Sequence, residues 1–331
     1  MKLKKNSNEL YKDGLILKKP LIILTGPTAV GKTSLSIQLA KAVGGEIISA
    51  DSMQVYKGMD IGTAKIEQKE MQGIKHHLID ILSPEEEFNI VQFQLLAKRA
   101  MEEIYLNAHI PIIVGGTGFY IQSLVYDIDF KENDVDKSMR KALELEAAQI
   151  GVYAMHEKLR VVDEKSADEI HPNNIKKVIR ALEFYYQTGE MISKHNEEER
   201  KKESPYNFSY FVLNQARDVL YERINQRIDT MIEKGLIAEV EILREKGYDK
   251  SLTSMQGLGY KEILDYLDGI MTREEAIFVL KRDTRHFAKR QLTWFKREKE
   301  VCWISKDDYR NELEILNKIS LILKEKSIIE E

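Results

Sequence analysis

The chain has 331 residues, of which 43% are hydrophobic and 31% are charged, and its formal net charge at pH 7 is −4. This length is sufficient for a full core and suggests two domains, and the negative net charge excludes a uniformly basic nucleic-acid binder but not a local basic patch. The single cysteine, Cys302, excludes an internal disulfide and a zinc site made of several cysteines, so we expect a cytoplasmic protein. No run of about 18 apolar residues is present, so we expect no membrane span.

The first part of the chain alternates between short apolar strands and amphipathic helices. Residues 20–24, 46–50 and 111–114 read as buried strands, and residues 34–43 and 90–107 have the apolar spacing of helices. Strands that alternate with helices indicate an α/β fold with a parallel sheet that helices cover on both faces.

The character of the sequence changes near Asp127. Residues 137–149, 152–162 and 173–188 show helical patterns rich in Glu and Lys, and residues 197–205 read as an exposed linker. Strand character returns at residues 208–213, and long helices follow at 219–233, 238–246 and 273–296. We therefore expect a core formed by residues 1–129 and 205–331, interrupted by an all-helical insertion at 130–204.

A glycine-rich segment between the first strand and the first helix has the pattern G-x-x-x-x-G-K-[ST]. We call this segment the phosphate loop; its residues are Gly26, Pro27, Thr28, Ala29, Val30, Gly31, Lys32 and Thr33. In this strand-to-helix context the backbone N–H groups bind phosphate oxygens, the lysine contacts a terminal phosphate and the threonine hydroxyl can bind Mg²⁺. The segment predicts a P-loop NTPase-like core and a polyphosphate or diphosphate ligand, without identifying that ligand.

A carboxylate, Asp51, directly follows the second strand. Because ligands of open parallel sheets bind at the carboxyl ends of the strands, Asp51 should face the same crevice as the phosphate loop. It could bind Mg²⁺ or act as a general base, but an aspartate at a strand end is also common as a turn residue. The adjacent His76 and His77 are expected to form hydrogen bonds, because neighbouring strand residues point to opposite faces and no further ligand completes a metal site.

The last long helix has a basic character. Between Lys281 and Arg297 there are seven Lys or Arg residues and one acidic residue, with Phe287, Trp294 and Phe295 among them. Such a local patch suits binding to the phosphates of a nucleic acid, but a solvated basic face is the simpler interpretation of the helix alone.

Longer strings resemble one family. The segment Asp51–Lys65, DSMQVYKGMDIGTAK, together with GPTAVGKT, closely resembles the tRNA dimethylallyltransferases, also called tRNA isopentenyltransferases. The resemblance extends to HHLID at 76–80, VGGTGFY at 114–120, HPNN at 171–174, RALE at 180–183, RINQRIDTM at 223–231, GLGYK at 257–261 and KRQLTWF at 289–295. These strings span most of residues 20–305, and their combination is far more specific than the phosphate loop.

The resemblance implies transfer of a dimethylallyl group from dimethylallyl diphosphate to the exocyclic N6 amine of the adenosine just 3′ of the tRNA anticodon, assisted by Mg²⁺. It implies that residues Gly26–Thr33 bind the diphosphate, that Thr33 binds the metal and that Asp51 takes the amine proton. It places Thr117 at the substrate nucleoside and an arginine at the leaving diphosphate, either Arg223 or Arg227. We expect a monomer, because one chain carries both substrate sites.

The resemblance also implies contacts with the anticodon stem-loop. The expected residues come from five segments: Asp51, Ser52, Met53 and Gln54; Thr117; Lys176, Lys177 and Arg180; Gly257, Gly259 and Tyr260; and Arg282, Arg285, Lys289 and Arg290. Lys177 stands where the family often has arginine, and because lysine lacks the bidentate geometry this contact is less specific.

Three other functions fit parts of the sequence. An adenylate isopentenyltransferase acting on free AMP or ATP would share the core but has less need of the helical insertion and the basic helix. A small-molecule kinase would explain the phosphate loop but not the DSMQVYKGMDIGTAK string. A non-catalytic tRNA-binding module would not need a complete phosphate site.

Overall fold

A six-stranded parallel sheet forms the centre of the first of two units in the computed structural model, which describes residues 10–12, 15–130 and 138–330. This unit comprises Met1–Val125 and Pro205–Glu331. The strands in spatial order are β5 (His76–His77), β4 (Gly45–Ala50), β6 (Ile110–Gly115), β3 (Lys19–Thr25), β7 (Tyr206–Asn214) and β8 (Val301–Ser305). Two further strands, β1 (Leu10–Lys12) and β2 (Leu15–Leu17), pair antiparallel outside this sheet.

The register of the sheet brings the phosphate loop and Asp51 to one edge. Thr25, the last residue of β3, pairs with Gly115 at the end of β6, and Gly115 pairs with Ala50 at the end of β4. The predicted strands are confirmed. The apolar run of β3 is fully buried between two helical layers, as expected for a central strand of a parallel sheet.

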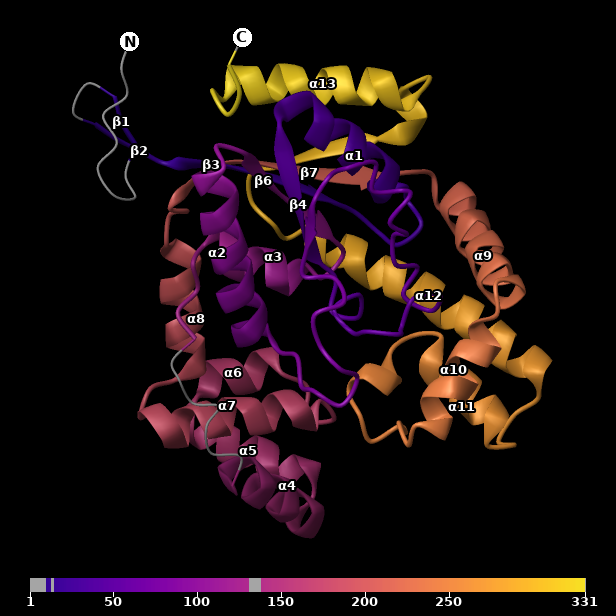
Figure 1. Ribbon diagram of the computed structural model, residues 1–331. Helices are drawn as coiled ribbons and strands as arrows, with labels where there is room; N and C mark the ends of the chain where they lie inside the picture. The colour runs from indigo at the N-terminus through magenta and orange to yellow at the C-terminus, as the bar shows by residue number, and fades with distance from the viewer. Residues whose placement is uncertain (1–9, 13–14, 131–137, 331) are drawn as a thin grey trace. The chain divides into compact units, whose positions relative to one another are not determined.

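Helices cover both faces of this sheet (Figure 1). Helices α1 (Lys32–Val43) and α13 (Glu312–Glu325) lie along one face, and α2 (Ile90–Leu106) and α3 (Gly118–Val125) lie along the other. The same unit contains α9 (Arg217–Glu233), α10 (Leu236–Glu245), α11 (Tyr260–Leu267) and the long α12 (Arg273–Phe295), which contacts α3, α9 and α11. Two short 3₁₀ turns, η1 (Ser254–Gln256) and η2 (Lys306–Asp308), complete it.

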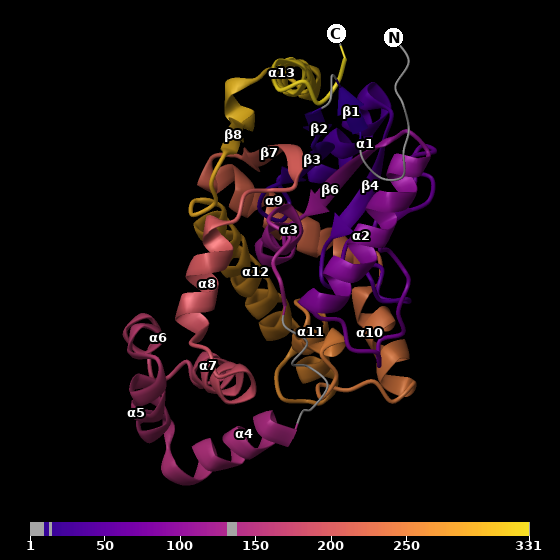
Figure 2. The ribbon, with the colours of Figure 1, turned by 90° about the vertical axis from the view of Figure 1, so that its left-hand side faces the viewer.

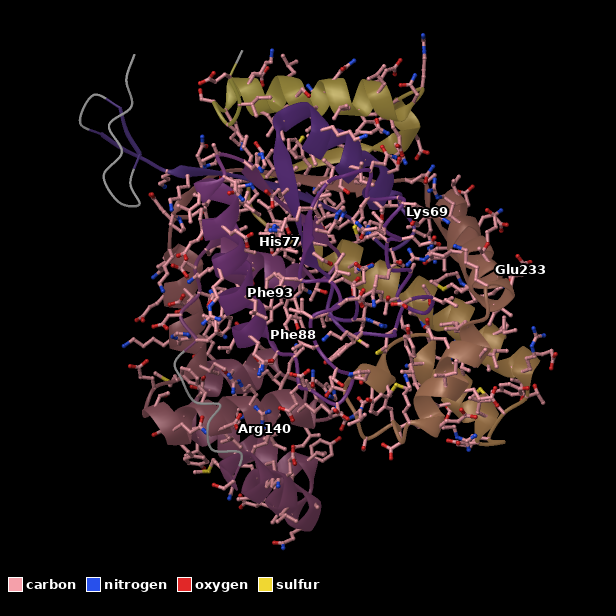
Figure 3. The ribbon with its side chains drawn as sticks, in the orientation of Figure 1. Lys69, His77, Phe88, Phe93, Arg140 and Glu233 are labelled. Carbon is pink, nitrogen blue, oxygen red and sulfur yellow. The ribbon has the colours of Figure 1, made fainter. Side chains whose placement is uncertain are left out.

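Aromatic and ionic contacts fix the layer that contains α2. A capping box between Asn89 and Gln92 starts the helix. Phe93 stacks on Tyr120 of α3 at 4.4 Å between ring centroids, with Phe88 edge-on to both rings. Phe88 and Phe93 are labelled in Figure 3. At strand β5, His77 binds the buried Glu46 carboxylate at 2.7 Å. The ring of His76 also has a hydrogen-bond partner, the Ile74 carbonyl oxygen at 2.9 Å, so both histidines form the hydrogen bonds that the sequence predicts.

The described part of the second unit, Tyr126–Ser204, contains helices and no strand (Figure 2). Its helices are α4 (Ser138–Ile150), α5 (Val152–Val162), α6 (Glu164–Glu169), α7 (Ile175–Thr188) and α8 (Ile192–Lys201). Helix α5 packs against α4, α6 and α7, around a core that contains Met155, Leu159 and Leu182. The buried Asp163 carboxylate accepts hydrogen bonds from the backbone and hydroxyl groups of both Ser166 and Ser193, and so joins α6 to α8.

The structure confirms the α/β fold with a helical insertion and corrects one segment. The predicted exposed linker at 197–205 is wrong for its first half, because residues 197–201 belong to α8. Glu199 is buried there and accepts a hydrogen bond from the backbone N–H of Asp129, which places residues 126–129 with the helical unit. No helix in the described ranges is long and apolar enough to cross a bilayer.

Candidate active site

The phosphate loop has the backbone conformation that its two glycines permit. Gly26 has φ 145° and Gly31 has φ 95°, values that disfavour residues with a side chain. A Cβ on Gly26 would lie 2.5 Å from the Leu213 carbonyl oxygen of β7, so only glycine fits between the loop and that strand. Helix α1 begins at Lys32 and not at the expected Ser34, so the loop ends directly at the helix N-terminus.

Lys32 is directed onto the loop itself. Its Nζ donates to the carbonyl oxygens of Gly26 at 2.9 Å and Pro27 at 2.8 Å. Burial, followed by the nearby positive charge of Arg227, lowers the pKa of the Lys32 ammonium to about 7, whereas Asp51 acts in the opposite direction. A phosphate anion at the loop would stabilise the charged form of this lysine.

Asp51 lies at the same edge and has the turn role that the sequence left open. Its Oδ1 accepts hydrogen bonds from the backbone N–H groups of Met53 at 2.9 Å and Gln54 at 3.4 Å, so the carboxylate forms an Asx turn. It also acts electrostatically on both Lys32 and Arg227. Among the described residues its Oδ2 has no hydrogen-bond partner, so this oxygen can accept a proton.

The second glycine-rich loop brings Thr117 to Asp51. The N–H of Thr117 donates to the carbonyl oxygen of Ala50, the residue before Asp51, at 3.2 Å. A Cβ on Gly115 would lie 2.2 Å from the same carbonyl oxygen, so glycine permits this close approach. The structure therefore brings the predicted base and the predicted nucleoside contact together.

The two candidate arginines of α9 occupy different positions at the loop. Arg223 donates from Nε to the Ala29 carbonyl oxygen at 3.0 Å, so it braces the loop from outside. Arg227, one helical turn later, lies beside Lys32 and Asp51, and burial lowers the pKa of its guanidinium while Asp51 opposes this shift. Arg223 therefore contacts the phosphate loop through a hydrogen bond, whereas Arg227 lies near Lys32 and Asp51.

Gln291 on α12 was not singled out as a site residue by the sequence. Its Oε1 accepts a hydrogen bond from the backbone N–H of Thr28 at 2.9 Å, and its Nε2 donates to the Gly116 carbonyl oxygen at 3.1 Å. The side chain is buried. Gln291 therefore joins the phosphate loop to the loop that carries Thr117, and its place in the string KRQLTWF was the only sequence signal.

The segment after Asp51 is held by α10 and α11. The carboxylate of Glu239 accepts hydrogen bonds from the N–H groups of residues 60, 61 and 62 and from the Tyr260 hydroxyl at 2.7 Å. The Tyr260 ring packs against Gly62, where a Cβ would lie 2.6 Å from it. Tyr260 is fully buried, so the direct RNA contact predicted for it does not fit this structure, and it supports the loop instead.

The other predicted RNA contacts of these segments also have partners or are partly buried. A Cβ on Gly257 would lie 2.5 Å from the Met53 methyl group, and Gly259 donates from its N–H to Glu262. Gln54 accepts from the Ser49 hydroxyl at 3.2 Å and donates to the Thr63 carbonyl oxygen. Ser52 is half-buried in the turn between Asp51 and Met53.

The four basic residues predicted on α12 differ in their surroundings. Arg282 pairs with Asp283 at 2.8 Å, and Arg285 donates to the Asn225 side chain at 2.7 Å. Lys289 and Arg290 instead line an open pocket of about 400 Å³ together with His286, Thr293, Trp294 and Arg297. The pocket is bounded by basic and aromatic side chains, which suits a nucleic-acid strand.

The remaining candidates belong to the helical unit, on α7. Lys176 and Lys177 are exposed in its first turn, and Arg180 pairs with Glu183 at 3.2 Å. The Glu183 carboxylate also pairs with Arg140 of α4 at 2.6 Å, so Arg180 belongs to an ionic contact that joins two helices.

The residues at the loop fit a magnesium ion that takes most of its ligands from a diphosphate. Thr33 is exposed at the start of α1, and its hydroxyl forms no hydrogen bond among the described residues. In the described parts of the chain, no group of three or more His, Cys, Asp and Glu residues is arranged so that it could hold a metal ion. Mg²⁺ commonly binds in such sites through one or two protein oxygens, phosphates and waters.

Comparison with known proteins gives consistent matches. A family model described as IPP transferase matches residues 54–298. A tRNA dimethylallyltransferase from Lachnoclostridium phytofermentans is 60% identical over 311 residues, which are 94% of this chain and 99% of that protein. One from Acetivibrio thermocellus is 50% identical over 92% of this chain and 97% of that protein.

Solved structures are also similar. The full-length tRNA isopentenylpyrophosphate transferase from Bacillus halodurans is 47% identical, with a TM-score of 0.71 over 94% of this chain and 98% of that chain. A eukaryotic dimethylallyltransferase acting on tRNA is 29% identical, with a TM-score of 0.81 over 94% of this chain and 80% of that chain.

Proposed function

The chain belongs to the IPP transferase family, and we propose that it transfers a dimethylallyl group from dimethylallyl diphosphate to the N6 amine of the adenosine 3′-adjacent to the tRNA anticodon. It is thus a prenyltransferase that acts on tRNA. The observation that carries the reaction is the position of Asp51, a carboxylate beside the phosphate loop and next to Lys32 and Arg227.

The proposed reaction breaks one bond and forms another. The adenosine N6 attacks the first carbon of the dimethylallyl group, and the bond between this carbon and the diphosphate oxygen breaks with its electron pair leaving on pyrophosphate. The amine then has one proton too many, which Asp51 Oδ2 accepts. An adenine amine is a weak nucleophile, so the site must stabilise the departing charge and align the two reactants.

The diphosphate in this proposal is bound by Gly26–Thr33, with Lys32 and Arg227 as its charged partners. The N–H groups of the loop and the N-terminus of α1 bind the phosphate oxygens. A magnesium ion held by Thr33 and the diphosphate would neutralise further negative charge. Thr117, beside Asp51, would orient the adenosine, which must leave its stack to enter the site.

In this proposal tRNA contacts the pocket lined by Lys289 and Arg290 of α12 and by Arg297, which follows this helix. It also contacts the exposed Lys176 and Lys177 on α7. The enzyme would work as a monomer, because each reacting group comes from one chain. A reducing cytoplasm suits its single cysteine.

Acceptor choice tests this function against its alternatives. The purified protein is given dimethylallyl diphosphate and Mg²⁺ with either an anticodon stem-loop RNA or free AMP. We expect prenylated RNA and unmodified AMP, since the relatives reported above are named for tRNA. Prenylation of AMP would indicate an adenylate isopentenyltransferase, and tRNA-stimulated hydrolysis of ATP would indicate a kinase-like or ATPase function.

A further inference from the structure

A second lysine lies at the phosphate loop. Lys306 opens the 3₁₀ turn that follows β8, so it lies at the same sheet edge as the loop and Asp51. Its Nζ is 2.8 Å from the point that a Cβ on Gly31 would occupy, and a terminal nitrogen of Arg223 is 3.4 Å from the same point. Two cationic groups from distant parts of the chain therefore converge on the last turn of the loop.

The hydrogen bonds of Lys306 are incomplete. Its side chain is only 12% exposed, yet the ammonium has three donors and makes one hydrogen bond among the described residues, to Glu312 Oε1 at 3.2 Å. This distance exceeds the roughly 2.7–2.9 Å typical of a charge-assisted hydrogen bond. The other oxygen of Glu312 is held from α1, by the Ser34 hydroxyl at 2.6 Å and by Gln38 at 3.1 Å.

The charges around the loop are unbalanced. The basic groups are Lys32, Arg223, Arg227 and Lys306, and the acidic groups that act on them are Asp51 and Glu312. The described part of this site therefore has excess positive charge in a chain whose net charge is −4. A diphosphate supplies the opposite charge and the acceptor oxygens that the Lys306 donors lack.

We propose that Lys306 binds the diphosphate of the prenyl donor, as an additional phosphate-binding residue that the C-terminal segment supplies to the loop. This proposal rests on the function proposed above. In it, Glu312 holds Lys306 beside Gly31 in the free protein, and the ammonium moves from this loose contact to a phosphate oxygen when the donor binds. The same ammonium then stabilises the charge that develops on the leaving pyrophosphate.

The simpler alternative is a structural ion pair in which Lys306 only fastens α13 to α1 through Glu312. The two roles predict different outcomes for a pair of variants. If the ion pair is structural, Lys306→Met and Glu312→Gln break the same contact and should have the same effect. If Lys306 binds phosphate, Lys306→Met removes a ligand, whereas Glu312→Gln removes a competitor for it.

The experiment measures binding of Mg²⁺-pyrophosphate and of dimethylallyl diphosphate to the full chain by titration calorimetry. We expect Lys306→Met to raise both dissociation constants about 10- to 100-fold, which is the usual effect of losing a hydrogen bond to a charged group. Glu312→Gln should leave them unchanged or lower them. Binding of the anticodon stem-loop RNA should not change in either variant, and Lys324→Ala, an exposed lysine of α13, is the control.

Two results would overturn the proposal: equal weakening by Lys306→Met and Glu312→Gln, or wild-type diphosphate binding by a folded Lys306→Met protein. Thermal unfolding of each variant shows whether it is folded. If Lys306→Met is unfolded, Lys306→Arg takes its place in the titration. It keeps the charge and should bind the diphosphate with most of the wild-type affinity. Failure of the proposed function would be seen separately, as absence of prenyl transfer by the unmodified protein.

Discussion

Asp51 uses its two carboxylate oxygens differently. Oδ1 accepts hydrogen bonds from two backbone N–H groups and fixes the turn, whereas Oδ2 forms no hydrogen bond among the described residues. Asp51→Asn should keep the turn, because an amide oxygen can accept the same N–H groups, but it cannot take the amine proton. We expect the single-turnover rate of transfer to fall by about 10²- to 10⁴-fold with RNA and diphosphate affinity retained.

Saturating RNA and donor make this measurement a test of chemistry and not of binding. Asp218→Asn, at an exposed carboxylate in the first turn of α9, is the matched control and should react at the wild-type rate. A loss of less than tenfold for Asp51→Asn would mean that Asp51 positions the adenosine without accepting its proton.

We expect Lys32 to make diphosphate binding dependent on pH. Burial lowers the pKa of its ammonium to about 7, and a bound anion raises it again. Above the lowered pKa the free protein must take up a proton to bind, so the dissociation constant for pyrophosphate should rise by up to about tenfold per pH unit between about pH 7 and pH 9. Calorimetry in two buffers of different ionisation enthalpy measures the proton uptake directly.

Lys32→Arg provides the comparison for this effect, because an arginine stays charged across this range. Its affinity can be lower if the longer side chain fits poorly, but the pH dependence between pH 7 and 9 should be much weaker. Wild-type binding that is flat with pH and releases or takes up no proton would contradict a lysine that is neutral in the free site.

The sequence predicted the loop and Asp51 because each is a contiguous motif next to a predicted strand. It could not predict Gln291 or Lys306 at the site, because hydrogen bonds and close contacts between residues more than 260 positions apart depend on the packing of α12 and β8. It also left Arg223 and Arg227 equivalent, since both lie on one helix and only their depth at the loop separates them.

Among the elements, α12 contains basic side chains that differ in whether a neighbouring side chain already binds them. Arg282 already pairs with Asp283 and Arg285 with Asn225, whereas Lys289 and Arg290 line the open pocket. In a salt titration of stem-loop binding, Lys289→Ala and Arg290→Ala should each lower the slope of log affinity against log salt by about 0.7 to 0.9. Arg282→Ala and Arg285→Ala should lower this slope by less, because Asp283 and Asn225 already bind these two side chains and compete with the RNA for them.

Diphosphate binding is the internal control for these four variants, since the phosphate loop lies on other elements. Equal effects of all four would mean that the RNA displaces Asp283 and Asn225 from their arginines. No effect of any of the four would mean that the helix is only a solvated face, as its composition alone suggests.

Helix α12 also supports the loop through Gln291, whose two hydrogen bonds fix Thr28 and Gly116. Gln291→Ala leaves a partly buried N–H and a buried carbonyl without these partners, so we expect a loss of about 1–3 kcal/mol in the free energy of unfolding and weaker diphosphate binding. Urea unfolding and pyrophosphate titration measure the two effects. Gln226→Ala, at an exposed side chain on α9, should change neither.

The linker predicted at 197–205, which is wrong for its first half, shows what apolar periodicity cannot predict. A helix there has no apolar stripe, so the search for apolar spacing finds nothing, although Glu, Arg and Lys are good helix formers. One contact that holds it is the hydrogen bond from the backbone N–H of Asp129 to the buried Glu199 carboxylate, a polar contact between segments 70 positions apart. The apolar stripes of α5 and α7, which form a real core, were predicted with nearly the observed bounds.

At the scale of the whole molecule, the two units have separate hydrophobic cores. Leu182 is fully buried in the core of the helical unit, with Met155 and Leu159 beside it. Both tryptophans, Trp294 and Trp303, belong to the other unit. Tryptophan fluorescence therefore reports unfolding of the sheet unit alone, whereas far-ultraviolet circular dichroism reports helices of both.

Because both tryptophans belong to the sheet unit, the stability of the helical unit can be measured separately in the intact chain. Leu182→Ala should destabilise the helical unit by about 2–5 kcal/mol. In urea, the circular dichroism of this variant should show an earlier transition, while the fluorescence midpoint stays at the wild-type value. Leu39→Ala, at a fully buried leucine of α1, should do the reverse and move the fluorescence midpoint.

Ligand binding can show which unit carries which substrate site. At a urea concentration between the two transitions of Leu182→Ala, pyrophosphate should still bind, because the phosphate loop, Arg227 and Lys306 all belong to the sheet unit. Stem-loop RNA should bind more weakly there, because α7 with Lys176 and Lys177 is unfolded. If fluorescence and circular dichroism shift together, the units unfold as one cooperative body, and the loss of RNA binding could no longer be assigned to the helical unit.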